Sequence, residues 1–192
     1  MNGSAGFHAP EDRGAAMVEM AILMPLLILL IIGVFEFGAA FKDFLTTSNA
    51  VRDGTRILSA RGTDPEADCV ALLAAVDALS LATRFDHLVS VEIFKADDSG
   101  DPIPGSINTY TYGFGDPTDC SDEAPNCGGW NCVIQYPPAD RQVLVGDTQP
   151  PLDLVGMRIV YTHDWMTGFP PFSGSITIDE QTISRLEPAG FG

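Results

Sequence analysis

Four cysteines are the residues whose spacing most directly suggests a defined chemistry. Cys69, Cys120, Cys127 and Cys132 make an even count, and the last three fall within a short segment rich in Gly, Asn and Pro. Outside the cytoplasm such a set favours two disulfides, for which three pairings are possible. Free thiols are a second interpretation. Zinc is a weaker one, because the C-x6-C-x4-C spacing lacks the close C-x2-C pairs typical of structural zinc sites.

A second candidate is the carboxylate of Glu19, which stands at the start of a run that stays uncharged until Glu36. A charged residue deep in a bilayer costs about 3 kcal/mol on insertion scales, so such residues are rare and usually functional. If the chain were cut between Gly14 and Ala15, the new α-amino group would stand four residues before Glu19, on the same helix face. The amine could then pair with this carboxylate in the same chain or in a packed neighbour, at a helix N-terminus that favours negative charge.

The remaining polar residues do not form a recognisable catalytic or metal-binding set. His8, His87 and His163 lack metal-ligand spacing, and the chain has no nucleophile motif such as G-x-S-x-G. The segment Asp97–Asp101 resembles part of a calcium loop but lacks the bidentate Glu and the flanking helices, so a solvated turn is expected there and at 116–123. We therefore expect a non-catalytic protein that uses no cofactor and no metal.

The elements that must position these residues begin with a long apolar segment, 14–44. From Ala15 to Phe41 a helix would rise about 40 Å, which exceeds the roughly 30 Å hydrocarbon core of a bilayer. This predicts a membrane span that tolerates Pro25, with a buried core helix as the alternative. The helix is expected to continue to about Ser59, with either close packing or a short break at Gly54. Its packed face would consist of Phe37, Phe41, Phe44, Ser48, Val51, Thr55 and Leu58, which recur at steps of three and four.

Past this helix, the pattern predicts one more helix and an antiparallel sheet. Asp64-Pro65-Glu66 is a helix start, and the helix should run to about Arg84. Its buried stripe would be Cys69, Leu72, Leu73, Val76 and Leu79. Period-two or β-rich runs predict strands at 89–93, 107–112, 133–136, 142–145, 154–165 and 175–186, separated by a polar turn at 97–105 and a loop at 113–131. The apolar loop Gly168–Phe172 is either a contact site or folded over the sheet.

These elements predict an α+β fold in three parts. Residues 1–14 form a flexible, leader-like segment, residues 15–41 a transmembrane helix, and residues 42–192 an α+β domain outside the cytoplasm. The formal net charge of −16 argues against a nucleic-acid partner and against docking on anionic lipid headgroups.

Two blocks of the chain and its ending resemble a known family. RGAAMVEMAILMPLLILLIIGVFEFG carries Arg13-Gly14, Val18-Glu19, Pro25 and Glu36, and AVRDGTR follows it at 50–56. Together with RLEP at 185–188, these stretches resemble TadE-like proteins, the pseudopilins of tight-adherence (Tad/Flp) pilus systems. Met20 departs from the related cleavage pattern, which prefers an aromatic residue just after the glutamate.

The resemblance implies a pilin-like protein whose N-terminal helix packs with other pilins after extraction from the membrane. Gly14 would end a cytoplasmic leader cut by a prepilin peptidase, and Glu19 would set the register of the packed helices. The implied partners are the membrane, the prepilin peptidase, other pilins or pseudopilins, and the Tad assembly machinery. A domain of this size suggests a minor component, since the major Flp pilins are much shorter. The alternatives are a single-pass, membrane-anchored extracytoplasmic binding domain that does not polymerise, and a membrane-tethered hydrolase, for which the sequence supplies no catalytic set.

Overall fold

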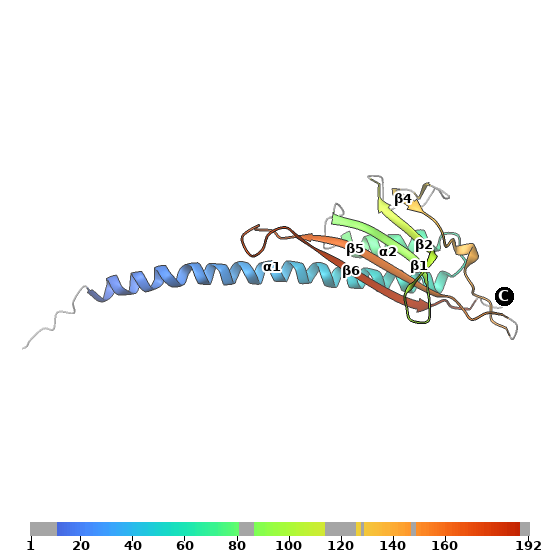
Figure 1. Cartoon of the computed structure of the whole chain (residues 1–192), viewed down its shortest axis with the longest axis horizontal. Helices are drawn as coiled ribbons and strands as arrows, with labels where there is room; N and C mark the ends of the chain where they lie inside the picture. Colours follow the sequence, from blue (N-terminus) through green and yellow to red (C-terminus); the bar gives the residue numbers. More distant parts are fainter. Residues whose placement is uncertain (1–10, 81–86, 114–125, 128, 147–148, 189–192) are drawn as a thin grey trace, which may run out of the picture.

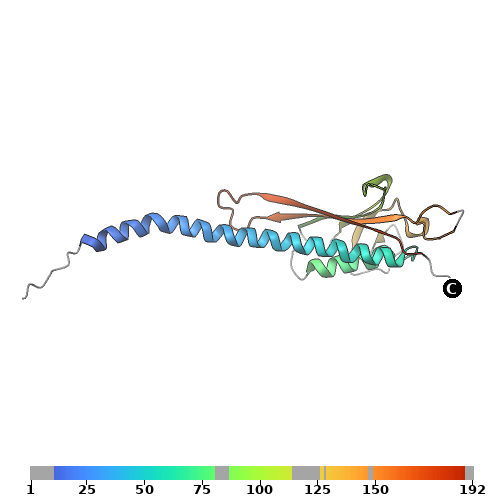
Figure 2. The same cartoon turned by 90° about the horizontal axis from the view of Figure 1, so that it is seen from below.

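The protein consists of one very long helix with an α+β domain assembled on its C-terminal half (Figure 1). The computed structural model describes residues 11–80, 87–113, 126–127, 129–146 and 149–188, without the side chains of 11–13, 80 and 126–127. The N-terminal half of the helix extends away from the domain (Figure 2). This arrangement confirms the predicted fold class, with a candidate membrane span that continues as the spine of an α+β domain.

Helix α1 (Glu11–Arg61) has 51 residues and would be about 75 Å long. It runs through Pro25 and Gly54 without interruption, so the continuous helix is confirmed and the break at Gly54 is wrong. Gly62, with a φ of +53°, follows the last turn, and its N–H donates to the carbonyl of Leu58 at 3.1 Å. A residue in the left-handed region directly after a helix is a common helix stop, and glycine adopts it without a Cβ penalty.

Helix α2 (Ala67–Ser80) folds back beside the C-terminal end of α1 (Figure 2). The predicted start signal is confirmed, because the side chain of Asp64 accepts a hydrogen bond from the N–H of Glu66 at 3.0 Å. The predicted end near Arg84 lies outside the described residues. Of the predicted stripe, Leu72, Val76 and Leu79 are buried, whereas Cys69 and Leu73 are only half-buried.

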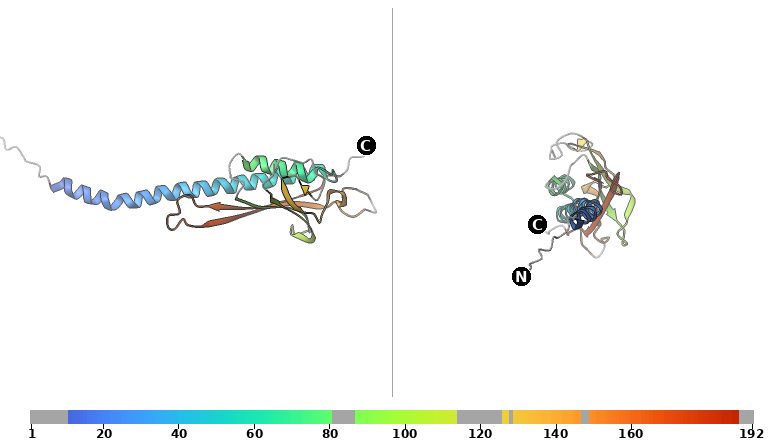
Figure 3. Two further views of the ribbon diagram at one scale, coloured as in Figure 1. Left: turned by 90° about the horizontal axis from the view of Figure 1, so that it is seen from above. Right: turned by 90° about the vertical axis from the view of Figure 1, so that its left-hand side faces the viewer.

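The sheet is antiparallel and six-stranded, in the order β3-β4-β2-β1-β5-β6. Its strands are β1 (Leu88–Ala96), β2 (Pro102–Tyr112), β3 (Asn126–Cys127), β4 (Trp130–Val133), β5 (Leu154–Asp164) and β6 (Ser175–Arg185). Helices α1 and α2 cover the same face of this sheet (Figure 3). The two layers enclose the core, which includes Val51, Leu58, Leu72, Val91, Ile93, Met157 and Ile159.

Three of the strand predictions between 102 and 145 are wrong in detail. Strand β2 begins at Pro102, inside the expected turn, and β3 and β4 begin inside the expected loop at 113–131. The segment 142–145 is not a strand. It follows a short 3-10 helix, η2, at residues 138–140. At the start of segment 142–145, the N–H of Gln142 donates to the carboxylate of Asp153 at 3.1 Å. A side chain thus accepts the hydrogen bond that the backbone of a neighbouring strand would otherwise accept.

The buried face of α1 differs from the predicted one. Val51, Thr55 and Leu58 are buried as expected, but Phe41 and Phe44 remain 60% and 41% exposed. The buried positions before Val51 are instead small or polar: Glu36, Ala40, Thr47 and Ala50. Short side chains on this face allow the backbones of β5 and β6 to approach the helix, which bulky phenylalanines would prevent.

Strand β6 is the edge of the sheet, and α1 covers it. The hydroxyl of Thr55 donates to the carbonyl of Thr182 at 3.2 Å, and the hydroxyl of Ser59 donates to that of Arg185 at 2.7 Å. These two contacts attach the C-terminal end of this edge strand to α1.

Candidate functional site

The N-terminal half of α1 is an apolar surface that the rest of the described chain leaves uncovered. Its most hydrophobic 18-residue window has a mean hydropathy of 2.7, and none of that window is buried. Its large side chains are exposed, and they include Met17, Val18, Ile22, Leu26, Ile28, Leu30 and Val34. A helix that is apolar on all sides and uncovered in water has the composition of a membrane-spanning or helix-packing segment.

The residues of the predicted cleavage and register site lie together at the start of this surface. Gly14, Ala15 and Glu19 are all exposed and all helical. Helix α1 begins at Glu11, so the peptide bond between Gly14 and Ala15 lies in its first turns. Ala15 and Glu19 are one turn apart on the same face, which is the spacing that pairing with an amine at Ala15 requires. Cleavage itself stays a prediction.

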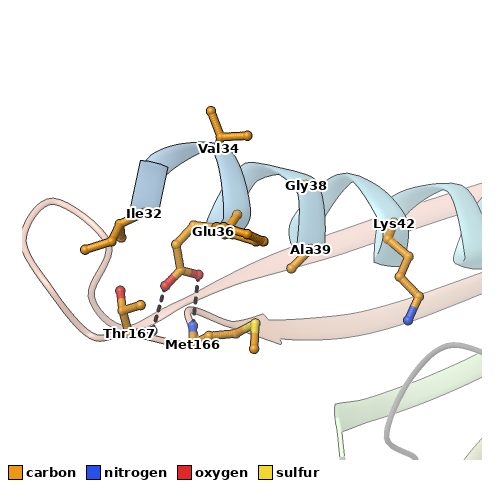
Figure 4. A pocket seen from close by; sticks show the side chains of 9 residues that line it. Ile32, Val34, Glu36, Gly38, Ala39, Lys42, Met166 and Thr167 are labelled. Carbon is orange, nitrogen blue, oxygen red and sulfur yellow. Dashed lines mark hydrogen bonds between the residues drawn. The ribbon is translucent and has the colours of Figure 1, made fainter. Parts of the chain in front are cut away.

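A contact that sequence reasoning did not identify joins the middle of α1 to the loop between β5 and β6. The Glu36 side chain is only 1% exposed. Its two carboxylate oxygens accept hydrogen bonds from the N–H groups of Met166 and Thr167, at 2.9 and 2.6 Å (Figure 4). Both acceptors of a charged group are thereby satisfied by backbone donors, which are among the strong hydrogen bonds in proteins. This contact fixes where the loop lies along the helix.

Aromatic side chains complete the same junction. The ring of Phe172 packs over Gly33, where an added Cβ would lie 3.6 Å from the ring, at ordinary van der Waals distance. Phe172 also packs edge-on against Phe37, with ring centroids 5.5 Å apart, and Trp165 lies 5.4 Å from Phe172. The loop thus folds onto α1. The prediction that Gly168–Phe172 folds over the sheet is wrong about the surface, because Phe172 is buried against α1. Phe169 is 52% exposed, and a contact role for the loop stays a prediction.

About two turns further along α1, a buried hydrogen bond joins the helix to the end of β5. His163 Nδ1 lies 2.7 Å from Asp43 Oδ2, and His163 is only 4% exposed. Its other ring nitrogen, Nε2, is buried and has no hydrogen-bond partner among the described residues. Strand β5 carries the imidazole onto α1, where Asp43 orients it.

Beside the Glu36 contact, an open pocket of about 510 Å³ lies between α1 and the loop (Figure 4). Its lining is almost entirely apolar and includes Ile32, Val34, Phe35, Met166 and Thr167. Lys42 stands at one end of it. Within the described chain, no group of three or more His, Cys, Asp or Glu side chains is arranged to hold a metal ion.

The cysteines occupy separate elements of the domain. Cys69 is on α2 and Cys132 on β4, and neither is a free cysteine. Cys120 and the side chain of Cys127 lie outside the described residues. The pairing of the four cysteines therefore stays a prediction.

The other polar candidates of the sequence are placed as follows. The acidic segment Asp97–Asp101 forms the turn between β1 and β2, where the carboxylate of Asp97 accepts the N–H groups of Ser99 and Asp101 at 2.8 and 3.0 Å. His87 lies beside β1, with Nδ1 3.0 Å from the carbonyl of Thr162. His8 and the acidic loop 116–123 lie outside the described residues.

A second buried polar cluster lies at the far end of the domain. The carboxylate of Asp68 on α2 pairs with Arg141 and accepts hydrogen bonds from Asn108 and Tyr110, each at 2.8 Å. Burial and the neighbouring carboxylate raise the pKa of Tyr110 far above its ordinary value. With every carboxylate oxygen bonded, this cluster attaches the segment after β4 to α2 and β2, which is a structural role.

Asp153 connects that segment to the sheet. Its carboxylate accepts hydrogen bonds from Lys95 at 2.7 Å and from the hydroxyl of Tyr136 at 2.8 Å. Burial opposes ionisation of Asp153, but the hydrogen bonds from Lys95, the Gln142 N–H and Tyr136 hold the pKa of this carboxyl below its ordinary value. The same burial and the Asp153 charge raise the pKa of Tyr136.

Two signals in the sequence point to the junction between α1 and the loop once the structure is known. Glu36 is flanked by aromatics in VFEFG, and the stretch from Trp165 to Ile178 contains no charged residue. Neither signal shows that the two stretches contact each other, because Glu36 and Met166 are 130 residues apart in the chain.

Comparison with known proteins gives one match. The family model described as TadE-like protein matches residues 14–56, which confirms the resemblance over this stretch and implies an association with the Tad pilus. The match covers the apolar half of α1, Glu19, Glu36 and the helix as far as Arg56. No curated protein and no solved structure matches the chain.

Proposed function

We propose that this protein is a pseudopilin or minor pilin that takes part, without catalysis, in assembling a tight-adherence pilus. The observation that carries the proposal is the uncovered apolar half of α1, which coincides with the TadE-like match and contains Glu19. A plain membrane anchor gains nothing from a carboxylate at this position. An assembling helix does, because the charge can pair with a neighbouring chain.

The proposed mechanism begins with the chain anchored in the cytoplasmic membrane by α1, with residues 42–192 outside. Cleavage after Gly14 by a prepilin peptidase would leave a free amine at Ala15. Glu19 would then pair with the amine of a packed neighbour and set the axial register between helices. The partners would be other pilins and the Tad assembly machinery, and the acidic outer domain would supply the specific surface.

Mass spectrometry of the native protein tests the processing step. We expect the chain to begin at Ala15 in a strain with an active prepilin peptidase. In a strain from which the peptidase gene has been deleted, it should begin at Met1. An intact Met1 in the strain with an active peptidase would contradict the cleavage step. It would favour the alternative, an anchored extracytoplasmic binding domain that does not polymerise.

Glu19→Ala tests the register. The variant should insert into the membrane normally but lose piliation, or incorporation of the protein into pili, as measured by microscopy and by immunoblotting of sheared filaments. Met20→Ala is the matched control, because Met20 is the next residue on the exposed surface and carries no charge. Normal piliation in Glu19→Ala would remove the role assigned to the carboxylate.

A further inference from the structure

The loop between β5 and β6, residues 165–174, is hereafter called the hairpin tip. It carries no charged residue, and neither does the strand that follows until Asp179. Met166 and Phe169 project from it with exposed fractions of 78% and 52%. An uncharged loop with exposed large apolar side chains is unusual on a protein with a net charge of −16.

The level of the hairpin tip along α1 is fixed by three contacts. The N–H groups of Met166 and Thr167 bond to Glu36, and Phe172 packs on Gly33. Strands β5 and β6 carry the tip away from the rest of the sheet, toward the N-terminal half of α1 (Figure 1). The tip therefore lies beside residues 33–37 of the helix, well beyond the remainder of the domain.

That level falls within the part of α1 that a bilayer would cover. A hydrocarbon core of about 30 Å that begins at Glu19 ends near Ala39. Gly33 then lies about 9 Å, and Glu36 about 4.5 Å, inside the outer boundary of the core, at a rise of about 1.5 Å per residue. A loop held beside these residues cannot stay in bulk water while α1 crosses the membrane.

We propose that the hairpin tip inserts into the outer interface of the same membrane and forms a second, apolar anchor beside α1. Phe169 and Met166 contact the acyl chains, and Trp165 lies near the headgroups, where aromatic side chains are favoured. The two backbone donors of the tip satisfy the Glu36 carboxylate, which would otherwise meet lipid unpaired. The occupant is lipid bound through its apolar region, because the acidic domain would repel anionic headgroups.

The inference rests on α1 spanning the membrane, which is part of the proposed function. The test uses the full chain reconstituted in phosphatidylcholine vesicles that contain lipids brominated in the acyl chains. Three variants each add one indole at an exposed position: Phe169→Trp in the tip, Ile28→Trp in the span, and Leu144→Trp as the control. Leu144 is matched to Phe169, because it is apolar and 55% exposed and belongs to the segment between β4 and β5. The emission added by each new indole is obtained by subtracting the wild-type signal.

Brominated lipid should quench the indoles at 169 and 28 several-fold more than the indole at 144. Aqueous acrylamide should show the reverse order. Strong quenching at 28 with equal quenching at 169 and 144 would overturn the inference and leave the membrane span intact. Weak quenching at all three positions would overturn the span and the inference together. A third outcome is that brominated lipid does not quench the indole at 169, whereas its protection from acrylamide increases with the protein-to-lipid ratio. That result would show that the tip contacts a second copy of the chain, and it would also overturn the inference.

Discussion

At the scale of single residues, the most informative side chain is Glu36, which is ionisable and buried at the boundary between the apolar and the packed halves of α1. Each of its two carboxylate oxygens accepts a hydrogen bond from a backbone N–H of the hairpin tip. Leaving a buried donor or acceptor unpaired costs more than making the hydrogen bond gains. Glu36 is therefore the residue that holds the tip against the helix.

Replacement of Glu36 by Ala should release the hairpin tip. The N–H groups of Met166 and Thr167 lose their acceptors, at a cost of about 1–3 kcal/mol. Their amide hydrogen exchange should accelerate by about tenfold or more, since about 1.4 kcal/mol corresponds to tenfold in the opening equilibrium. Glu36→Gln is the control, because it keeps one carbonyl acceptor and should show a smaller effect. Unchanged exchange at 166 and 167 in Glu36→Ala would show that the two hydrogen bonds do not hold the tip.

Asp153 makes the stability of the domain depend on pH. Its folded-state pKa is lowered, so its stabilisation is present above the unfolded pKa and is lost as the pH falls through the folded value. We expect the midpoint of thermal unfolding to decrease as the pH is lowered below about 4, the ordinary range of an Asp carboxyl. Asp153→Asn should be less stable at neutral pH and should show a flatter acid dependence. An identical acid profile in this variant would assign the effect to other carboxylates, such as Asp179, whose pKa is lowered chiefly by its hydrogen bonds with Arg158.

At the scale of elements, α1 serves two environments along one continuous helix. Between Glu19 and Glu36 it is apolar on every side, and its second half buries a face of small and polar residues, together with Val51 and Leu58, under β5, β6 and α2. Gly54 is the closest point of this packing. A Cβ placed there would overlap the Met157 side chain and approach the carbonyl of Ala71 at 3.3 Å.

Gly54→Ala should destabilise the domain although alanine is the better helix former. Overpacking a tight core costs about 1–3 kcal/mol, which outweighs the helix-propensity gain of about 1 kcal/mol. Gly38→Ala is the matched control on the same helix, because nothing lies within 4 Å of its Cβ position. Chemical unfolding in detergent should give a lower midpoint for Gly54→Ala and an unchanged or higher one for Gly38→Ala. Shortening Met157 in the Gly54→Ala background should restore part of the loss, and failure to do so would place the strain elsewhere.

At the scale of the whole molecule, the protein combines a helical rod, uncharged between Glu19 and Glu36, with an acidic domain. The domain lies on one side of the helix and leaves the N-terminal half free for lipid or for other helices (Figures 1 and 3). A domain of this size gains considerably from cross-links, since a disulfide typically stabilises by about 2–4 kcal/mol. Cys69 on α2 and Cys132 on β4 lie in the two layers that such bridges would join.

A thiol count tests the two predicted disulfides. Full-length protein exported to its native compartment, then denatured without reductant, should react with no thiol reagent. The same sample after reduction should react at four positions, which serves as the control for reagent access. Four reactive thiols before reduction would contradict the bridges, and the unfolding midpoint should then be insensitive to reductant.

Most of the fold could be predicted from local sequence signals. The uninterrupted apolar run predicts the span, Asp64-Pro65 predicts the start of α2, and period-two alternation predicts β1 and β5. Each of these signals acts between residues a few positions apart, so periodicity and capping are enough. The strand prediction at 142–145 is wrong because a side chain, Asp153, satisfies the Gln142 N–H that a strand would pair with a neighbour.

What the sequence by itself determined is that one long helix is apolar in its first half and that Glu19 stands in it one turn after Ala15. Tertiary structure alone decided which face of the second half is buried, and that Glu36 and Asp43 meet Met166, Thr167 and His163. These partners are 120 to 131 residues apart in the chain. No local pattern encodes such pairs, because they arise only when β5 and β6 pair in register and pack along α1. Phe41 and Phe44 are exposed for the same reason, since the close approach of the strands selects small residues on the contact face.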